Sequence, residues 1–152
     1  NYKMIVMSYI KALFHIVICT HNREMSISEE HKRELYKYIF GVIKNYNCTL
    51  VRINGIPNHI HMLVDINSGV AISNFIRDIK RSSSVWIKES RLFPLFNGWG
   101  REYGAFACSY VDCDKVIEYI KNQEAHHVSE VYEMEYRNLI MKNGLTYYDT
   151  KD

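Results

Sequence analysis

Apolar residues recur along the chain in runs whose spacing alternates between the two-residue period of a strand and the longer period of a helix. Four runs predict strands: residues 9–20, 49–54, 59–66 and 102–111. Apolar residues on both faces of the first run suggest a strand inside a sheet, and His15 within it is expected to be a packed histidine. Asn54-Gly55, extended by Pro57-Asn58, predicts the hairpin turn between the second and third strands.

Helical spacing fills the segments between and after these strands. Ser26 and Glu29 match a capping box, which predicts a helix from about residue 28 to residue 46. A second helix begins near Ile72. Two further helices have recognisable ends: Asp112 or Asp114 as the first N-cap, Ser129 as the second N-cap, and Asn143-Gly144 as the final stop.

The predicted order is strand, helix, strand, strand, helix, strand, followed by two helices. This order is typical of an α+β ferredoxin-like βαββαβ sandwich with an antiparallel sheet, here with a C-terminal helical extension. The two helices within the repeat are expected to cover one sheet face, which leaves the other face for the third helix. We expect a single domain over residues 1–152, since this length suffices for one core.

Composition favours a soluble globular protein, with 47% hydrophobic and 24% charged residues. No apolar run approaches the ~20 residues of a membrane span, so we expect no membrane partner. The four cysteines form no Cys-x-x-Cys pair, which favours reduced thiols and a cytoplasmic, nucleoid-associated location.

The net charge of +2 is too small to predict nucleic-acid binding by itself. Any DNA contact would come from local basic patches. Four basic residues lie on or near the polar side of the second predicted helix: Arg77, Lys80, Arg81 and Lys88. Such a face is usually only solvated, and its alternative role is contact with DNA phosphates.

The third predicted strand carries His59-Ile60-His61 directly after a turn. Side chains alternate along a strand, so His59 and His61 point the same way while Ile60 points into the core. Two imidazoles on one face can hold one divalent metal ion. Taken alone, this pattern is more often structural, and a second chemical group is needed to favour a site.

That group lies on the third predicted helix, where Tyr119 and Gln123 are four residues apart and share a face. Residues 119–127 read Tyr-Ile-Lys-Asn-Gln-Glu-Ala-His-His. An amphipathic helix with a half-buried tyrosine would explain this segment equally well if it stood alone, because the chain has twelve tyrosines.

Together the two motifs resemble those of the single-tyrosine HUH transposases of small bacterial insertion sequences, the IS200-like type. HUH denotes His, hydrophobic, His, and the nucleophile motif of that family is Tyr-x-x-Asn-Gln followed by paired histidines. Residues 100–109 are also similar to the family's Gly-Tyr-Gly-Ala-Phe-Ser stretch, and the resemblance extends from about residue 14 to residue 148. Two departures are Asn58, where Asp is common, and Gly100-Arg101 after Trp99, where Gln is common.

The resemblance implies a DNA transposase that cuts and rejoins single-stranded DNA beside hairpins at element ends through a 5′-phosphotyrosine intermediate. Tyr119 would be the nucleophile, and His59, His61 and Gln123 would hold Mg²⁺ or Mn²⁺. The resemblance also implies a homodimer with composite sites, in which the tyrosine helix of one subunit serves the histidines of the other. The short connection at residues 111–113 leaves packing within one subunit equally open.

Three other functions stay open at this point. The first is a non-transposing HUH endonuclease of the REP-associated type. The second is a zinc hydrolase built on His59 and His61, which needs a third ligand; Asp65 shares their face but lies two positions further along. The third is a non-catalytic nucleic-acid-binding sandwich, although the His59 face lacks the aromatic residues on which such domains stack bases.

Overall fold

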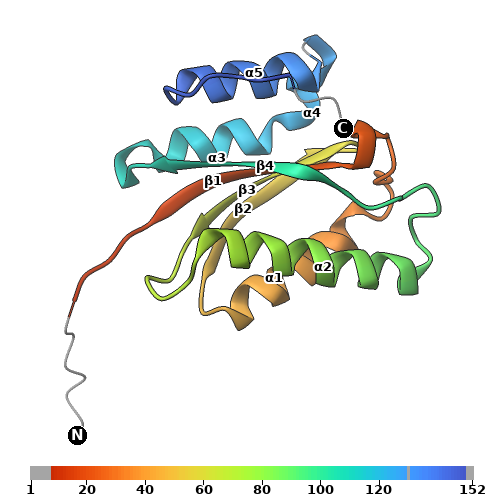
Figure 1. Cartoon of the computed structure of the whole chain (residues 1–152), viewed down its shortest axis with the longest axis horizontal. Coiled ribbons are helices and arrows are strands. Elements are labelled where there is room, and N and C mark those ends of the chain that lie inside the picture. Colours follow the sequence, from red (N-terminus) through yellow and green to blue (C-terminus); the bar gives the residue numbers. More distant parts are fainter. Residues whose placement is uncertain (1–7, 130, 150–152) are drawn as a thin grey trace, which may run out of the picture.

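Four strands form one antiparallel sheet in the order β2-β3-β1-β4 (Figure 1). The structure is a computed structural model, and it describes residues 8–129 and 131–149. The strands are β1 (Leu13–Thr20), β2 (Thr49–Ile56), β3 (His59–Asp65) and β4 (Trp99–Cys108). Because helices connect β1 to β2 and β3 to β4, the predicted α+β ferredoxin-like βαββαβ order is confirmed.

Helices cover both faces of this sheet (Figure 1). One face carries α1 (Lys32–Asn45) and α2 (Ile72–Ser90). The other face carries the C-terminal extension, which consists of α3 (Cys113–Lys121), α4 (Gln123–Ser129) and α5 (Tyr132–Lys142). Two short 3-10 helices, η1 (His21–Arg23) and η2 (Tyr110–Asp112), follow β1 and β4. None of the helices in the described ranges combines the length and the apolar character that crossing a bilayer requires.

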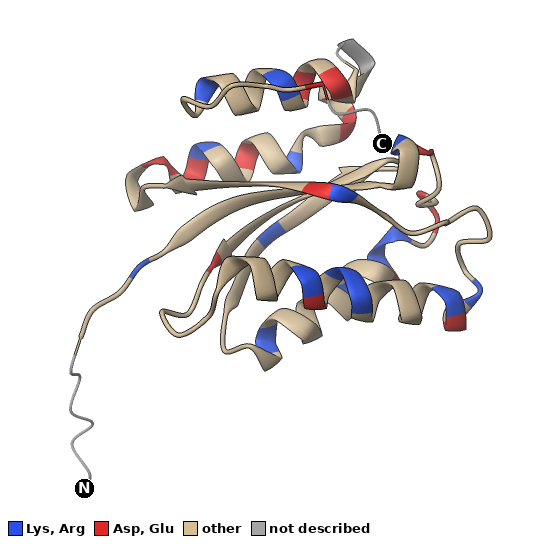
Figure 2. Cartoon of the chain, viewed as in Figure 1, with Lys and Arg blue, Asp and Glu red and all other residues tan. Residues whose placement is uncertain are grey.

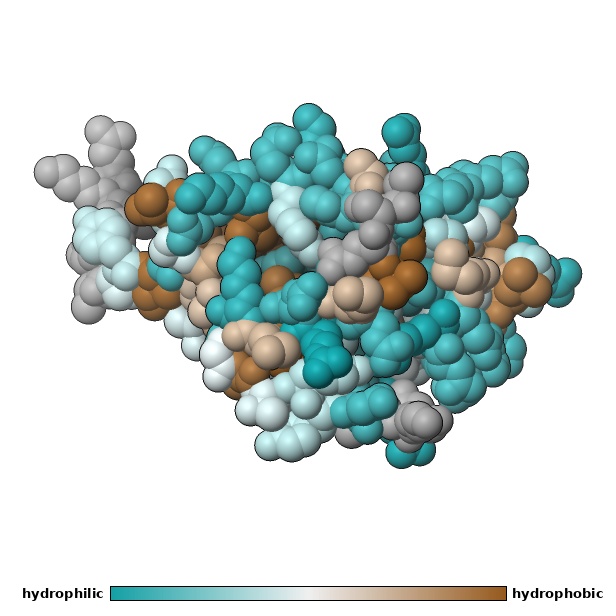
Figure 3. All heavy atoms as spheres, turned by 90° about the horizontal axis from the view of Figure 1, so that it is seen from above, coloured by the Kyte–Doolittle hydropathy of each residue, from teal (hydrophilic) through white to brown (hydrophobic). Residues whose placement is uncertain are grey.

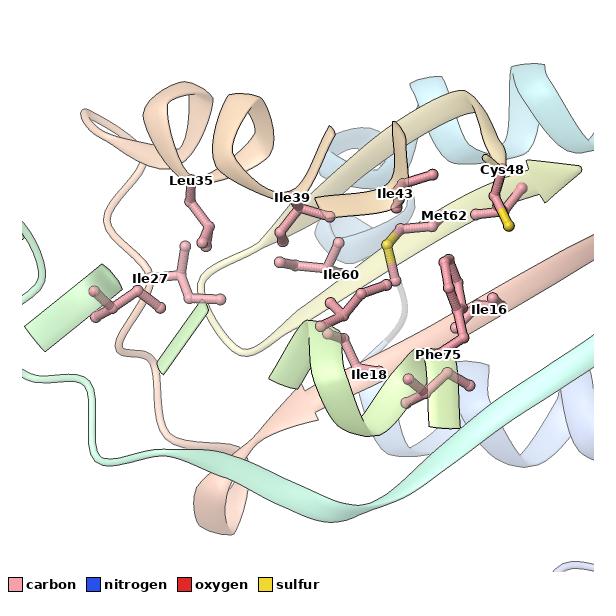
Figure 4. Packing of buried hydrophobic residues seen from close by; sticks show 14 of the residues in the cluster. Ile16, Ile18, Ile27, Leu35, Ile39, Ile43, Cys48, Ile60, Met62 and Phe75 are labelled. Atoms are coloured by element: carbon pink, nitrogen blue, oxygen red, sulfur yellow. The ribbon is translucent and has the colours of Figure 1, made fainter. Parts of the chain in front are cut away.

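Alternate residues of the two central strands form the core between the sheet and α1 and α2 (Figure 4). Four fully buried side chains come from the strands: Ile16 and Ile18 of β1, and Ile60 and Met62 of β3. The helices add Leu35, Ile39 and Ile43 from α1 and Phe75, Ile76 and Ile79 from α2. Burying each such side chain contributes about 1.5–3 kcal/mol, so this layer holds α1 and α2 on the sheet.

The opposite face of the sheet is covered by two smaller apolar clusters. Ile120 of α3 packs against Leu63 of β3. Tyr132 and Tyr136 of α5 pack against Phe106 of β4 and its neighbours on β1. α3 therefore lies over β2 and β3, while α5 lies over β1 and β4.

The turn between β2 and β3 is Pro57-Asn58, and not Asn54-Gly55 as the sequence suggested. Asn54 and Gly55 belong to β2. A side chain at Gly55 would collide with the carbonyl oxygen of His59 on the neighbouring strand. Glycine is needed here for close approach of two backbones, which selects the same residue as a tight turn does.

The predicted capping box at Ser26 and Glu29 is wrong. α1 begins only after His31, and the N-cap makes no side-chain hydrogen bond. The backbone N–H groups of Ser26 and Ile27 instead donate to the carbonyl of Pro57, at 3.0 and 2.9 Å. This contact ties the segment to the β2–β3 turn and keeps it out of the helix.

Other boundaries are shifted by a few residues. The third predicted helix divides at Asn122 into α3 and α4, with Asp112 at the N-cap position of α3. The fourth begins after Val131 rather than at Ser129, whose side chain lies outside the described residues. β1 starts at residue 13 rather than 9, and β4 covers residues 99–108 rather than 102–111.

Candidate metal and nucleophile site

His59 and His61 lie on β3 with their rings on the α3–α5 side of the sheet. The ring centres are 4.9 Å apart, as expected for alternate residues of one strand. The two side chains are 0% and 1% exposed because the C-terminal helices cover them. The two histidines therefore lie in a buried site between the sheet and the C-terminal helices, and not on an open surface.

Glu135 of α5 completes a group of three possible metal ligands with the two histidines. Its Oε1 lies 2.8 Å from Nε2 of His61, and its Oε2 lies 3.8 Å from Nε2 of His59. The side chain is only 3% exposed. The sequence analysis did not predict Glu135, although one signal was present: it lies on the same helix face as the buried Tyr132 and the half-buried Leu139, where a carboxylate is unusual.

Gln123 joins the site from the first position of α4 and is fully buried. Its Nε2 donates to Oε1 of Glu135 at 3.0 Å, which turns its Oε1 toward Nε2 of His59 at the same distance. Ligand atoms about 2.1 Å from an octahedral ion are about 3 Å from one another. The spacing of these atoms is therefore that of groups which share one ion.

Tyr119 reaches the same place from α3. Its hydroxyl donates to Oε1 of Glu135 at 2.5 Å, and its ring centre lies 5.7 Å from that of His61. All these side chains belong to one chain, so the structure brings the predicted tyrosine, histidine pair and glutamine together without a partner subunit. His127, one of the paired histidines in the motif, contacts the other oxygen of Glu135.

Hydrogen bonds on the outer side of each imidazole indicate which nitrogen faces the site. Nδ1 of His59 lies 2.7 Å from Oδ1 of Asn58, which can only accept, so Nδ1 carries the proton and Nε2 keeps its lone pair. Nδ1 of His61 lies 2.8 Å from Nε2 of His15, a buried residue on β1. When His61 donates in that contact, its Nε2 also presents a lone pair to the site.

These tautomers make both Nε2 atoms face oxygen atoms that are themselves acceptors. Nε2 of His61 and Oε2 of Glu135 have no hydrogen-bond partner in the described part of the chain, although the two residues are in close contact. Opposed lone pairs in a buried site are stable when a cation lies among them. The donor set thus fits a divalent ion.

Electrostatics lead to the same conclusion. Burial lowers the pKa of His59 and of His15 to about 3, with the neighbouring His61 as the second cause in both, and burial also lowers the pKa of His61. Burial alone would raise the pKa of the Glu135 carboxyl, but that pKa lies below its usual range because the carboxylate accepts hydrogen bonds, including the one from the Tyr119 hydroxyl. Neutral imidazoles around an ionised carboxylate leave one buried negative charge that a cation would balance.

Asn54 fixes the position of the helix that carries Tyr119. Its Nδ2 donates to the carbonyls of Ile120 and Lys121, both at 3.1 Å, and to Oε2 of Glu124 at 3.0 Å. The carbonyls at a helix C-terminus have no partner within the helix, so a side-chain donor there both caps and anchors it. The strand residue opposite His61 thus holds the end of α3 over the histidine pair.

The sequence matches a family model over residues 8–123, and that model describes IS200-like transposases. The chain belongs to the IS200-like transposase family. A search of the curated proteins finds no significant match to the sequence.

Two solved structures resemble this IS200-like transposase. One is a presumed transposase from Deinococcus radiodurans, with 20% identity and a TM-score of 0.62 over 80% of this chain and 98% of that chain. The other is a REP-associated tyrosine transposase bound to a REP hairpin, with 18% identity and a TM-score of 0.62 over 99% of this chain and 92% of that chain. At these identities the likeness shows that the fold is shared.

In this IS200-like transposase, the basic residues predicted to contact DNA lie on the helical layer on the opposite side of the sheet from the His–Tyr site. Arg77, Lys80, Arg81 and Lys88 all belong to α2, which carries blue segments in Figure 2 on the opposite side of the sheet from α3 to α5. Lys80 donates to the carbonyls of Gly100 and Glu102 at the start of β4, at 2.9 and 3.0 Å. Any DNA contact by this surface is therefore separate from the His–Tyr site, and it stays a prediction.

Two other tyrosines could have competed for the role of nucleophile. Tyr103 lies on β4 below the ammonium group of Lys80, and Tyr110 in η2 is 73% exposed. Neither belongs to the group around Glu135, whereas Tyr119 donates a hydrogen bond to it. Asp65, the ligand considered for a zinc site, instead accepts hydrogen bonds from Lys11 and from the backbone of Ala12.

Proposed function

We propose that this chain cuts and rejoins single-stranded DNA through a covalent bond to Tyr119, with a divalent metal held by His59, His61, Glu135 and Gln123. The observation that carries this proposal is the hydrogen bond from the Tyr119 hydroxyl to the Glu135 carboxylate, which also faces both histidines. One carboxylate thereby links the nucleophile to the donor set that fits a metal ion.

The reaction needs a tyrosine oxygen to attack a phosphodiester phosphorus. A P–O bond forms between the Tyr119 oxygen and the phosphorus, and the bond from phosphorus to the 3′-oxygen breaks. The tyrosine hydroxyl releases its proton to solvent, and the 3′-oxygen of the leaving strand takes up a proton from solvent. Reversal by a 3′-hydroxyl rejoins DNA without an external energy source. Free tyrosine is a weak nucleophile at neutral pH. The protein supplies the orientation of the Tyr119 hydroxyl by Glu135 and the half-buried position of this side chain next to the metal ligands.

Mg²⁺ or Mn²⁺ at this site would neutralise charge on the phosphate and orient its oxygens for in-line displacement. His59 and His61 would provide neutral nitrogen ligands, and Gln123 a neutral oxygen. Glu135 adds the single negative charge of the set. A mixed nitrogen and oxygen set of this kind suits Mn²⁺ or Mg²⁺ better than an all-histidine or cysteine set does.

The proposed substrate is DNA with a hairpin near the cleavage position, at the ends of a mobile element. Family membership and the REP-hairpin complex of the similar structure support this choice. The same neighbour leaves a non-transposing role in cutting REP hairpins as a variant of the proposal. A homodimer is proposed on the family resemblance, with each Tyr119 acting either in its own subunit, as its position here favours, or in the partner.

The test is adduct formation with labelled single-stranded hairpin DNA in Mn²⁺ or Mg²⁺. Wild-type protein is expected to form a covalent adduct that EDTA prevents, and mass spectrometry of the trapped product is expected to place the phosphate on the Tyr119 peptide. Tyr119→Phe keeps the ring and its packing and is expected to form none. Tyr103→Phe is the matched control and is expected to behave as wild type; an adduct retained by Tyr119→Phe and lost in Tyr103→Phe would overturn the assignment.

The presence of Glu135 favours one second candidate, a zinc hydrolase. Two histidines and a glutamate are a ligand set found in zinc hydrolases, where a bound water is the nucleophile. Hydrolysis by Tyr119→Phe at the wild-type rate, with zinc bound and no covalent adduct, would favour that reading.

A further inference from the structure

A groove of about 680 Å³ runs between α3 and α5 and reaches the Tyr119–Glu135 pair. The two helices run in opposite directions (Figure 1), so the C-terminal end of α3 meets the N-terminal end of α5 at the metal-ligand group. The volume lies in the range of about 300–1,000 Å³ that is typical of small-molecule sites. The proposed chemistry uses only the inner end of this groove.

The groove is lined by facing stripes of the two helices. α3 presents Lys115, Val116 and Tyr119, and α5 presents Glu135, Leu139 and Lys142. The α5 residues are three, four and seven positions apart and lie on one helix face. On α3, Val116 and Lys115 lie three and four positions before Tyr119, so both are neighbours of Tyr119 on the helix surface. Residues of the sheet, including Phe106 and His15, close the floor.

The chemistry changes along the length of the groove. The tyrosine and the carboxylate lie at the inner end, and apolar side chains line the middle. Lys115 and Lys142 lie at the outer end together with Asp112, whose carboxylate accepts a hydrogen bond from the Ser109 hydroxyl. Lys115 is one helical turn, about 6 Å along the axis, from Tyr119. Within the described part of the chain, neither lysine forms an ion pair.

We propose that this groove binds the nucleotide on the 3′ side of the scissile phosphate, the one that stays attached to Tyr119 after cleavage. This inference rests on the proposed function. In-line displacement places the leaving 3′-oxygen opposite the attacking tyrosine oxygen, so the nucleotide that carries the 5′-phosphate is the one beside Tyr119. Tyr119 itself lines the groove, so a nucleotide joined to Tyr119 would lie at the inner end of the groove.

The sequence of groups in the groove matches the sequence of groups along a DNA strand. The scissile phosphate lies at the inner end, the base rests on Val116 and Leu139 above Phe106, and the next phosphate lies between Lys115 and Lys142. Apolar and aromatic contacts with the faces of bases, together with cations along the backbone, are the usual means of holding single-stranded DNA. Asn138 and Asn143, also at the wall, can contact base edges.

A long apolar partner fits this layer less well. Figure 3 looks onto the side of the molecule formed by α5 and shows a mainly hydrophilic surface with separate apolar patches. A docked amphipathic helix would need a continuous apolar stripe. The groove instead alternates charge and apolar surface over the length of about one nucleotide.

The direct test is NMR titration of the ¹⁵N-labelled protein with each of the four deoxynucleoside 5′-monophosphates, none of which contains a bond that the enzyme can cut. We expect chemical-shift changes centred on Val116, Leu139 and Lys142. Inorganic phosphate and the free deoxynucleosides, added separately, are expected to bind more weakly than the nucleotides. Shifts centred on α2, or none at the solubility limit of the nucleotides, would overturn the inference.

Two matched substitutions on α5 give the control. Leu139→Trp fills the groove and is expected to weaken nucleotide binding about tenfold, a loss that corresponds to one stacking contact. Met141→Trp adds the same bulk at a position that is 57% exposed and outside the groove, and is expected to bind nucleotide as wild type does. Both variants keep every proposed metal ligand, so equal Mn²⁺ affinity in the two confirms that they are folded.

A second experiment separates this inference from the proposed function. Wild-type protein is incubated with a random single-stranded DNA library, and the DNA left on Tyr119 is sequenced from its first nucleotide. Leu139→Trp is expected to change the base preference at that nucleotide, and Met141→Trp is not. Nucleotide binding without any adduct would defeat the proposed function alone, whereas adducts with no nucleotide binding in the groove would defeat this inference alone.

Discussion

The α1–α2 face and the α3–α5 face of the sheet are made by alternate residues of the same two central strands. The first face presents only apolar side chains at its centre: Ile16, Ile18, Ile60 and Met62. The second presents His15, His59 and His61, roofed by Tyr119, Gln123 and Glu135. Both faces are equally buried, so exposure does not distinguish the functional face from the structural one.

The difference lies in what burial requires of each face. An apolar side chain needs only contact, and its removal from water stabilises the fold. A buried polar group needs a partner with defined geometry, because an unpaired one is destabilising. The polar face therefore carries a hydrogen-bonded network that the proposed metal ion would complete. Because side chains alternate along a strand, neighbouring residues of β3 belong one to the structural face and the next to the polar face.

The largest expected difference between the two faces comes from substitutions at two neighbouring residues of β3, His61 and Met62. Met62→Ala is expected to destabilise the fold by about 2–5 kcal/mol because it leaves a cavity in the core, while the protein that remains folded keeps its Mn²⁺ stoichiometry. His61→Ala is expected to abolish Mn²⁺ binding and DNA cleavage while the protein stays folded. Chemical denaturation and metal titration of both variants measure the two effects; cleavage by His61→Ala at the wild-type rate would break the comparison.

Glu135→Gln tests whether the charge of Glu135, which covers the polar face, is needed for metal binding. The substitution keeps the size of the side chain and removes its charge, so the site loses its one anionic group. Substitution of a residue that only hydrogen-bonds to a metal ligand typically lowers metal affinity about 10- to 100-fold. Because Glu135 is itself a proposed ligand, we expect Mn²⁺ affinity to fall by at least that factor. Glu133→Gln, on the exposed side of the same helix, is the control and should leave the affinity unchanged; equal losses in both would show a general charge effect instead.

Acid should act mainly through the buried histidines of the polar face. Burial is the main cause that lowers the pKa values of His15 and His59 to about 3 in the folded protein, whereas the ordinary histidine pKa is 6.5. Below pH 6.5 the unfolded chain therefore binds more protons than the folded protein does. The free energy of unfolding of the metal-free protein should thus be constant above about pH 6.5 and decrease toward pH 3, by up to about 1.4 kcal/mol per pH unit for each histidine. Denaturation curves at several pH values measure this slope.

His15→Leu removes one of the buried histidines whose pKa is lowered and gives the control for the acid experiment. Its slope between pH 6.5 and pH 4 is expected to be shallower than that of wild type. A slope that is identical in both proteins would show that other groups govern the acid sensitivity.

The smallest predicted effect concerns the anchor of α3. Asn54→Ala removes the side-chain donor to two carbonyls at the end of that helix, and each lost hydrogen bond is worth about 0.5–1.5 kcal/mol. Amide hydrogen exchange in α3 is expected to accelerate, while exchange in α2, on the other face, stays as in wild type. Uniform acceleration in both helices would mean that Asn54 acts on global stability only.

The sequence was sufficient for the sheet and for the residues of recognisable motifs. Strand alternation predicted the two faces. The resemblance of the His59–His61 and Tyr119–Gln123 motifs to a known family predicted that these groups act together, and the structure brings them into contact. Glu135 was not predicted because it belongs to no short motif and reaches the site only through the packing of α5. His15 was predicted to be a packed histidine, and the structure shows that its side chain contacts His61 on the neighbouring strand.

Local signals failed where tertiary contacts replaced them. Asn54-Gly55 has the composition of a hairpin turn, yet both residues serve contacts between elements, with α3 and with β3. Ser26 and Glu29 have the spacing of a capping box, but the backbone of that segment bonds to the β2–β3 turn. In each case the contact partner is distant in sequence.

The central claim is that the polar face binds one divalent ion between β3 and the C-terminal helices. Its most direct test is paramagnetic broadening of NMR signals by substoichiometric Mn²⁺ in the 152-residue protein. The account predicts broadening centred on His59, His61 and Glu135, with Tyr119 among the first signals lost, and no effect of Mn²⁺ in the His61→Ala protein. Broadening centred on surface carboxylates, with the His59 and His61 signals unaffected, would contradict it.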